Sequence, residues 1–292
     1  MNIEKQLTAF PELIEQALVI KDKVKLGGIN KLVIAGIGGS GVAGDLLRDY
    51  LIDKIKLPIV TVKNTIPIVD SKTLAFVVSY SGNTRETINI YKGLKKQKAK
   101  IVVFCSGGKL LNTKEKKIMI PKGYEPRMAI SFQFFAMLKL LGINEDAEDV
   151  LKVVKEFDEK DAEDIVEDIV GMIPVIYASN EKLKTLAYKW KTDFNETAKI
   201  PAVYNYFTEI NHNEIEAELD DNEFCVLFLG EGDKEVEKAM KFIKGDKIIL
   251  RGKTELGRLF YGLLLGEYVS YYLAKIKKKD PEATPRIDQL HG

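Results

Sequence analysis

Hydroxyl side chains gather where an apolar run ends, in the stretch FVVSYSGNTRET. Apolar residues 74–78 are followed at once by Ser79, Ser81 and Thr84, with Gly82 among them. A short apolar run that stops at polar residues is typical of a buried strand followed by a loop. Several hydroxyl groups at one place can serve a ligand with several acceptor oxygens, such as a phosphate monoester. We therefore predict that Ser79, Ser81 and Thr84 bind a phosphate group.

A glycine-rich loop, GIGGSGVAGD, follows the first apolar run of the chain. Gly36, Gly38 and Gly41 match the dinucleotide pattern G-x-G-x-x-G. That motif also requires an acidic residue at the end of its second strand. Here that strand ends TVKNT, which contains no acidic residue. Ser40 stands at the turn into a helix, where free N–H groups and the helix dipole favour an anion. We therefore favour phosphate binding by Ser40, with Gly38 and Gly39 beside the substrate, over a nicotinamide or flavin dinucleotide.

Helix capping is the simpler alternative for the hydroxyl loop. Ser81, Asn83 or Thr84 could cap the following helix, and Asn83 would place Glu86 at the third helical position, as in a capping box. Capping accounts for one or two of these residues. It does not account for the whole group, or for the matching serine at position 40.

The chain that carries these loops alternates between apolar runs and helical stretches. The strands are expected at 31–36, 58–62, 73–79, 100–105, 173–178, 201–206, 224–229 and 247–250. The helices are expected at 1–20, 41–53, 85–96, 127–141, 181–194, 234–244 and 253–277. Continuously apolar strands are typical of a parallel sheet covered on both faces. Loops at the carboxyl ends of such strands lie side by side, so the Ser40 and Ser79 loops should converge.

The pattern occurs twice, which predicts an α/β protein of two doubly wound parallel-sheet domains. The acid-rich residues 145–168 are expected to form a helix or helix pair at the boundary. We expect a first domain at 1–152, with an N-terminal helix and the phosphate loops, and a second domain at 153–292. The polar tail, KKKDPEATPRIDQLHG, is expected from its composition to be flexible.

Composition excludes several classes of function. The 44 basic and 43 acidic residues give a net charge of +1, so neither nucleic acid nor an anionic membrane is an expected partner. Cys105 and Cys225 have no metal-ligand spacing and indicate free thiols in a reducing compartment, which favours the cytoplasm. The N-terminus has no signal-peptide pattern. The apolar stretch 256–274 is interrupted by Arg258 and Glu267, which favours a packing or subunit-contact helix over a membrane span.

The two loops resemble those of the sugar isomerase domain family. SYSGNTRET is similar to its phosphate loop and GIGGSGVAGD to its first loop. The further stretches FCSGGKL, PRMA, NETAKIPA and EINHNE make nearly the whole chain similar to the bifunctional phosphoglucose/phosphomannose isomerases of archaea and bacteria. The resemblance implies hexose phosphate substrates, glycolysis or gluconeogenesis as the setting, no metal or other cofactor, and a homodimer with its site at or near the subunit interface.

The resemblance implies catalytic roles for three residues. Interconverting an aldose and a ketose phosphate moves a proton between C1 and C2 through a cis-enediol, and one carboxylate can carry it; Glu196 is the candidate. His212 is the candidate for ring opening, entering from the partner subunit, and Arg127 for stabilising the enediolate. The simpler alternatives are a surface glutamate, a loop histidine satisfied by its neighbours, and an arginine in a structural ion pair.

The C-terminal tail departs from the family. A lysine that helps to open the ring is expected a few residues after a Thr-Pro element, and His291 stands in its place. Thr284 matches the threonine associated with acceptance of both C2 epimers. A histidine can exchange a proton near neutral pH. The alternative is that His291 belongs to a disordered end.

Two other functions compete with this isomerase. An isomerase of another sugar phosphate, such as a hexulose phosphate, is one, although those relatives typically have a single sugar isomerase domain. A non-catalytic sugar-phosphate sensor is the other, although the chain shows no separate DNA-binding segment.

Overall fold

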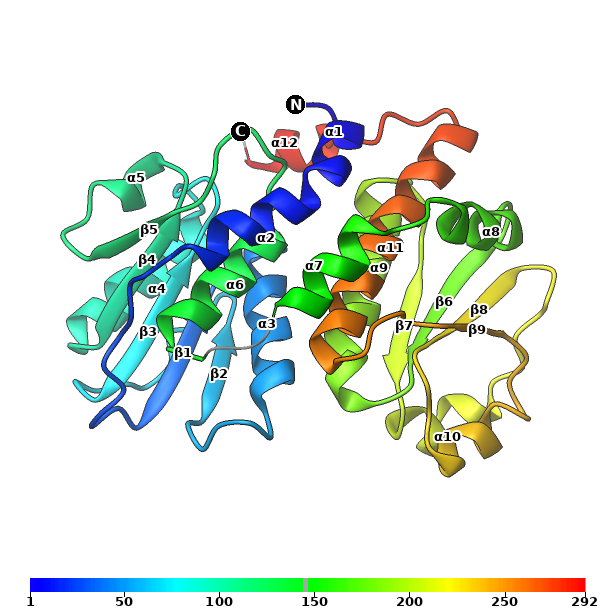
Figure 1. Ribbon diagram of the computed structural model, residues 1–292, viewed down its shortest axis with the longest axis horizontal. Coiled ribbons are helices and arrows are strands. Elements are labelled where there is room, and N and C mark those ends of the chain that lie inside the picture. The colour runs from blue at the N-terminus through cyan, green and yellow to red at the C-terminus, as the bar shows by residue number, and fades with distance from the viewer. Residues whose placement is uncertain (144–146, 292) are drawn as a thin grey trace. The chain divides into compact units, whose positions relative to one another are not determined.

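The chain forms two compact units in the computed structural model, which describes residues 1–143 and 147–291 (Figure 1). Unit 1 comprises the described residues of 8–146, and unit 2 comprises those of 147–292 together with Asn2–Leu7. Each unit is built on one parallel sheet. The predicted α/β fold with two parallel-sheet domains is therefore confirmed. The predicted limits of 1–152 and 153–292 stay a prediction.

Unit 1 is a five-stranded sheet in the order β2-β1-β3-β4-β5. Its elements are α2 (Phe10–Leu18), β1 (Lys31–Ala35), α3 (Gly39–Leu51), β2 (Ile59–Val62), β3 (Thr73–Val78), α4 (Arg85–Lys96), β4 (Lys100–Cys105), α5 (Gly108–Leu111), β5 (Lys116–Met119) and α6 (Ile130–Leu140). Val33 and Val77 join a buried cluster with Ile90 of α4. Ile34, one residue on, faces helix α3 at Gly44. Both faces of the sheet are therefore covered, as continuously apolar strands require.

Unit 2 is a four-stranded sheet in the order β7-β6-β8-β9. Its elements are α1 (Ile3–Thr8), α7 (Glu148–Lys155), α8 (Lys160–Ile169), β6 (Ile173–Ala178), η1 (Glu181–Leu183), α9 (Lys184–Glu196), β7 (Val203–Tyr206), η2 (Glu209–His212), η3 (Glu214–Glu216), β8 (Phe224–Leu229), α10 (Lys234–Ala239), β9 (Asp246–Ile248), α11 (Glu255–Ile276) and α12 (Pro285–His291). Helix α9 packs on β6 and β7, and α11 packs on α7, α8 and α9. The long apolar helix α11 is thus covered within its own unit, so its apolar character is no argument for a dimer.

The ends of the chain differ from expectation. The single helix predicted over 1–20 is two helices, because α2 starts anew with Pro11 in its first turn, where the missing N–H costs nothing. The tail, expected to be flexible, instead ends in helix α12. Its first turn is stabilised by Thr284, whose carbonyl accepts from the Asp288 N–H at 2.9 Å. The predicted acidic helix pair is present as α7 and α8, but its start at Glu145 lies outside the described residues.

Within the described residues, no helix has both the length and the apolar character needed to cross a membrane.

Candidate functional site

Helix α3 begins at the glycine-rich loop, in a backbone shape that only glycine adopts readily. Gly38 precedes the helix with φ +59° and ψ −138°. Gly39 is needed for space, because a Cβ there would lie 2.8 Å from the Pro126 carbonyl oxygen and 3.0 Å from the Arg127 Cα. The two glycines therefore let the segment before α6 approach the start of α3 closely. This brings Arg127 beside the loop that carries Ser40.

Ser40 is buried in the first turn of α3 and joins the two loops. Its hydroxyl oxygen accepts a hydrogen bond from the backbone N–H of Tyr80 at 3.2 Å. It accepts a second from Nε2 of Gln133, on helix α6, at 3.3 Å. The glycine-rich loop and the hydroxyl loop thus meet at the carboxyl ends of the neighbouring strands β1 and β3.

The hydroxyl loop holds Ser79 and Thr84 together. Their side-chain oxygens lie 3.0 Å apart, and Ser79 Oγ also accepts from the Gly82 N–H at 3.1 Å. Thr84 is the N-cap residue of α4, yet within the described part of the chain its side chain makes no capping hydrogen bond. Ser81 is exposed, and its hydroxyl accepts from the Asn83 N–H at 3.2 Å.

The capping alternative therefore fails for two of the residues that it was meant to explain. Asn83 is not the cap of α4, and its Oδ1 accepts from the Lys109 N–H at 3.0 Å, across the loop. Because capping does not occupy the Thr84 hydroxyl, its pairing with Ser79 needs another reason. A hydroxyl pair at the start of α4, with the N–H groups of that helix nearby, is suited to an anion.

Arg127 is buried and lies next to these loops. Its Nη1 is 3.4 Å from Glu125 Oε2, so it makes the ion pair that its simpler interpretation required. The segment before it is fixed by Tyr80, whose hydroxyl accepts from the Tyr124 N–H at 2.9 Å. Burial raises the pKa of Tyr80, which keeps its hydroxyl protonated. The backbone of Arg127 thus lies against the start of α3, and its guanidinium is paired with Glu125.

Three side chains of this region were not predicted from the sequence. Ser106 follows strand β4 and donates to the Tyr80 carbonyl at 2.7 Å, and it could have been found because a hydroxyl after a buried strand is the signal that identified Ser79. Tyr80 stands within the quoted loop itself. Gln133 gives only a faint signal, as an amide in the apolar sequence ISFQFFAML.

Glu196 is half-buried at the last position of helix α9 in unit 2. Its backbone carbonyl accepts a hydrogen bond from the Lys199 amine. One turn earlier, Asp193 forms a buried ion pair with Lys189, whose Nζ also lies 3.1 Å from Glu267 Oε1 on α11. Burial alone would lower the pKa of the lysine, but the two carboxylates raise it above its usual value, so the amine is charged.

His212 is exposed at the end of η2, beyond strand β7. Since β6 and β7 are parallel, α9 must run from the carboxyl edge of the sheet back to its amino edge. Glu196, at the end of α9, therefore lies at the amino edge, whereas His212 follows the carboxyl end of β7. Figure 1 shows α9 and β7 in unit 2. The two side chains of one chain thus lie at opposite edges of this sheet.

The tail residues lie on helix α12. Thr284 is half-buried at its start, with Oγ1 3.3 Å from Asp288 Oδ1. His291 is the last residue of that helix.

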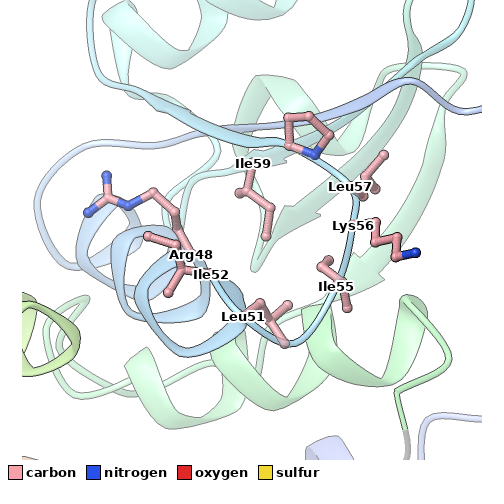
Figure 2. A pocket seen from close by; sticks show the side chains of 8 residues that line it. Arg48, Leu51, Ile52, Ile55, Lys56, Leu57 and Ile59 are labelled. Atoms are coloured by element: carbon pink, nitrogen blue, oxygen red, sulfur yellow. The ribbon is translucent and has the colours of Figure 1, made fainter.

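A cavity of about 290 Å³ in unit 1 lies elsewhere (Figure 2). It is lined by the end of α3 and the start of β2, including Leu51, Ile55 and Ile59. These positions are at the amino edge of the sheet, opposite the loops. The cavity is therefore not part of the candidate site. Among the described residues, no group of three His, Cys, Asp or Glu side chains could hold a metal ion.

Comparisons with known proteins cover both units. The SIS domain family matches residues 25–141, and the bacterial phospho-glucose isomerase C-terminal SIS domain matches residues 158–292. The bifunctional phosphoglucose/phosphomannose isomerase of Caldicellulosiruptor bescii is 34% identical over 96% of this chain and 95% of its own. The D-glucosamine-6-phosphate 4-epimerase of Sulfolobus acidocaldarius is 31% identical over 88% of each chain.

A solved structure supports the fold alone. The glucosamine-6-phosphate deaminase of Thermotoga maritima matches with a TM-score of 0.77 at 15% identity, covering 97% of this chain and 96% of its own.

Proposed function

We propose, from the premise that the chain belongs to the family of bifunctional phosphoglucose/phosphomannose isomerases, that it interconverts glucose 6-phosphate and mannose 6-phosphate with fructose 6-phosphate. The observation that carries the proposal is that the glycine-rich loop and the hydroxyl loop meet in unit 1, with the buried Arg127 next to them. That arrangement offers hydroxyl donors and positive charge to a phosphate ester.

The phosphate would be bound by Ser40, Ser79, Ser81 and Thr84. A hydroxyl can donate one hydrogen bond, and a phosphate monoester offers only acceptor oxygens near neutral pH. The hydroxyls at Ser40, Ser79 and Thr84 are held by hydrogen bonds before any ligand arrives. Preorganised donors lower the entropy cost of binding. Gly38, where a Cβ would meet nothing within 4 Å, would leave room for the ligand, and Gly39 would contact it through its backbone.

Proton transfer would be carried out by Glu196. Its carboxylate takes the proton from C2 of the open-chain aldose and returns it to C1, which gives the ketose through a cis-enediol. The negative charge that develops on the enediolate oxygen is balanced by Arg127. The buried ion pairs along α9 hold the end of that helix, and with it Glu196, in place.

Ring opening would be carried out by His212, which we propose to come from a second copy of the chain. The support is topological, because His212 and Glu196 of one chain lie at opposite edges of the same sheet. A homodimer in which each site takes its glutamate from one subunit and its histidine from the other resolves that separation. We further propose that His291 replaces the lysine of the family at the ring oxygen, and that Thr284 contacts the substrate near C2.

One relative favours a second candidate function. The epimerase of Sulfolobus acidocaldarius is only slightly less similar than the isomerase of Caldicellulosiruptor bescii, at 31% against 34% identity. Epimerisation at C4 of glucosamine 6-phosphate would use the same phosphate site with different chemistry. A non-catalytic sugar-phosphate sensor would also use that site, without chemistry.

Proton NMR in deuterated water separates these functions. The purified protein is incubated with fructose 6-phosphate and, separately, with glucosamine 6-phosphate. We expect both glucose 6-phosphate and mannose 6-phosphate to form with deuterium at C2, and glucosamine 6-phosphate to stay unchanged. If only glucose 6-phosphate forms, the protein has no mannose 6-phosphate isomerase activity. If glucosamine 6-phosphate is converted and fructose 6-phosphate is not, the protein is an epimerase and the isomerase proposal is wrong.

The variant Glu196→Gln separates an enzyme from a sensor. General acid–base catalysis contributes about 10²- to 10⁴-fold to a rate, so turnover should fall by at least about 100-fold. Binding of sorbitol 6-phosphate, which has no carbonyl group to isomerise, should stay within about 3-fold, because the phosphate contacts are intact. A wild-type protein that binds this ester but never turns over fructose 6-phosphate would be a sensor.

A further inference from the structure

Gln133 is a buried amide in an apolar helix, and the proposed mechanism does not use it. Its side chain is 0% exposed, and its neighbours along α6 include Phe132, Phe134 and Phe135. A buried amide costs free energy unless both of its ends find partners. Only one end does here: Oε1 has no hydrogen-bond partner among the described residues. An apolar side chain of the same size would fill this position at lower cost if packing were the only requirement.

The other end of the amide contacts the candidate site. Nε2 of Gln133 lies 3.3 Å from Ser40 Oγ, and the Tyr80 N–H lies 3.2 Å from the same oxygen. Both groups donate. A serine hydroxyl has two lone pairs and one hydrogen. Because both lone pairs of Ser40 Oγ accept hydrogen bonds, its hydrogen points in a third direction and can only be donated to another acceptor.

We propose that Gln133 is a positioning residue that turns the Ser40 hydroxyl into a committed donor for an oxygen of a phosphate monoester. An acceptor in its place would take the Ser40 hydrogen and leave a lone pair facing the phosphate. The half-paired amide is retained because its N–H end, and not its volume, is needed. The inference rests on the proposed phosphate site. It adds Gln133 as the residue that makes Ser40 the donor in its hydrogen bond to the phosphate.

The second loop differs, because only one donor to Ser79 is fixed by the backbone. Ser79 Oγ accepts from the Gly82 N–H and shares one hydrogen bond with Thr84 Oγ1. If Ser79 donates to Thr84, the Thr84 hydrogen is left for the ligand. One backbone N–H leaves the direction of that pair open, whereas at Ser40 a backbone N–H and the Gln133 amide together fill both lone pairs.

A double-mutant cycle tests the proposal, with sorbitol 6-phosphate binding measured by calorimetry. Gln133→Met keeps the volume of the side chain and removes the donor. A net hydrogen bond changes affinity by about 2- to 10-fold, so we expect the Kd of Gln133→Met to rise by that factor. In a Ser40→Ala background the same change should alter the Kd by less than about 2-fold, because the group through which it acts is gone.

The control is Thr87→Val, which removes another buried hydroxyl of unit 1, one whose Oγ1 has no hydrogen-bond partner among the described residues. It should leave the Kd unchanged. Thermal unfolding separates positioning from packing: Gln133→Met should keep or raise Tm while weakening binding. A lower Tm with an unchanged Kd, or an equal loss of affinity with and without Ser40, would overturn the proposal.

The same measurement distinguishes this inference from the proposed function. If the wild-type protein binds sorbitol 6-phosphate but does not isomerise fructose 6-phosphate, the isomerase proposal fails and the cycle still tests Gln133. If the wild-type protein does not bind the ester, the phosphate site and the role of Gln133 fail together.

Discussion

At the residue scale, the candidate phosphate site depends on close contacts that only particular residues permit. Gly39 has no Cβ, and Pro126 and Arg127 occupy the space that a Cβ would need. The contact is with backbone atoms, which cannot rotate away as the end of a long side chain can. The position of Arg127 beside the Ser40 loop is therefore linked to the glycine.

We expect Gly39→Ala to impair both binding and stability. Overpacking of this kind costs about 1–3 kcal/mol, and the displaced segment carries the guanidinium. The Kd for sorbitol 6-phosphate and the midpoint of urea unfolding are the two measurements. Gly27→Ala is the matched control in the same unit, because a Cβ there meets nothing within 4 Å. Equal behaviour of the two variants would contradict the argument.

Some site residues were predictable from the sequence and others were not. Ser40, Ser79 and Thr84 stand directly after or near apolar runs, and topology then requires their loops to be neighbours. Gln133 could not be predicted, because its contact with Ser40 joins residues 93 positions apart in two different helices. For Glu196 and His212, only the family resemblance distinguishes them from surface residues, and their roles stay a proposal.

At the element scale, helix α9 is held to α11 by a buried group of charges. Lys189, Asp193 and Glu267 are each no more than 3% exposed, and the lysine contacts both carboxylates. Burying charges is costly unless each is paired. The arrangement links the two helices because displacement of either one would break the contact between Lys189 and Glu267.

We expect Lys189→Met to destabilise the protein by about 3–5 kcal/mol, since it removes a buried cation that contacts two buried carboxylates. Urea unfolding followed by circular dichroism measures the loss. Lys191→Met provides the control on the same helix, because Lys191 is half-exposed, and its effect should be within about 0.5 kcal/mol. A loss below about 1 kcal/mol for Lys189→Met would mean that the pairs contribute little.

Two elements that the sequence failed to predict share a physical cause. Strand β5, Lys116–Met119, lies at the edge of its sheet and buries only Ile118, so it has no continuous apolar run. Helix α12 has a polar, largely exposed sequence, with no hydrophobic pattern to reveal it. The central strands were predictable because burial on both faces forces nearly every residue to be apolar.

At the scale of the whole molecule, the separation of Glu196 and His212 bears on assembly. One chain holds them at opposite edges of the sheet in unit 2. If each site takes one of them from each subunit, then a monomer has no complete set. Activity would then require the dimer.

Complementation between two inactive variants tests this arrangement. Glu196→Gln and His212→Ala are co-expressed with different tags and purified together. In a mixed dimer one site carries both changes and the other carries neither. The unsorted mixture, in which about half of the dimers are mixed, should therefore show about one quarter of wild-type activity, and mixed dimers isolated through both tags about one half. Each variant alone stays inactive. No recovery in verified mixed dimers would mean that both residues serve one site from the same chain.

The first helix of the chain belongs to the unit that is completed last. Ile3 is buried and donates its N–H to Glu282 Oε1 at 3.0 Å, although 279 positions separate them. During synthesis, at about 5–20 residues per second, α1 leaves the ribosome roughly 15–55 s before that partner exists. Unit 1 can complete its sheet during this interval, whereas Ile3 cannot yet form its hydrogen bond with Glu282. A ribosome that stalls before the tail therefore leaves a nascent chain whose first helix lacks the hydrogen bond that ties its start to residue 282.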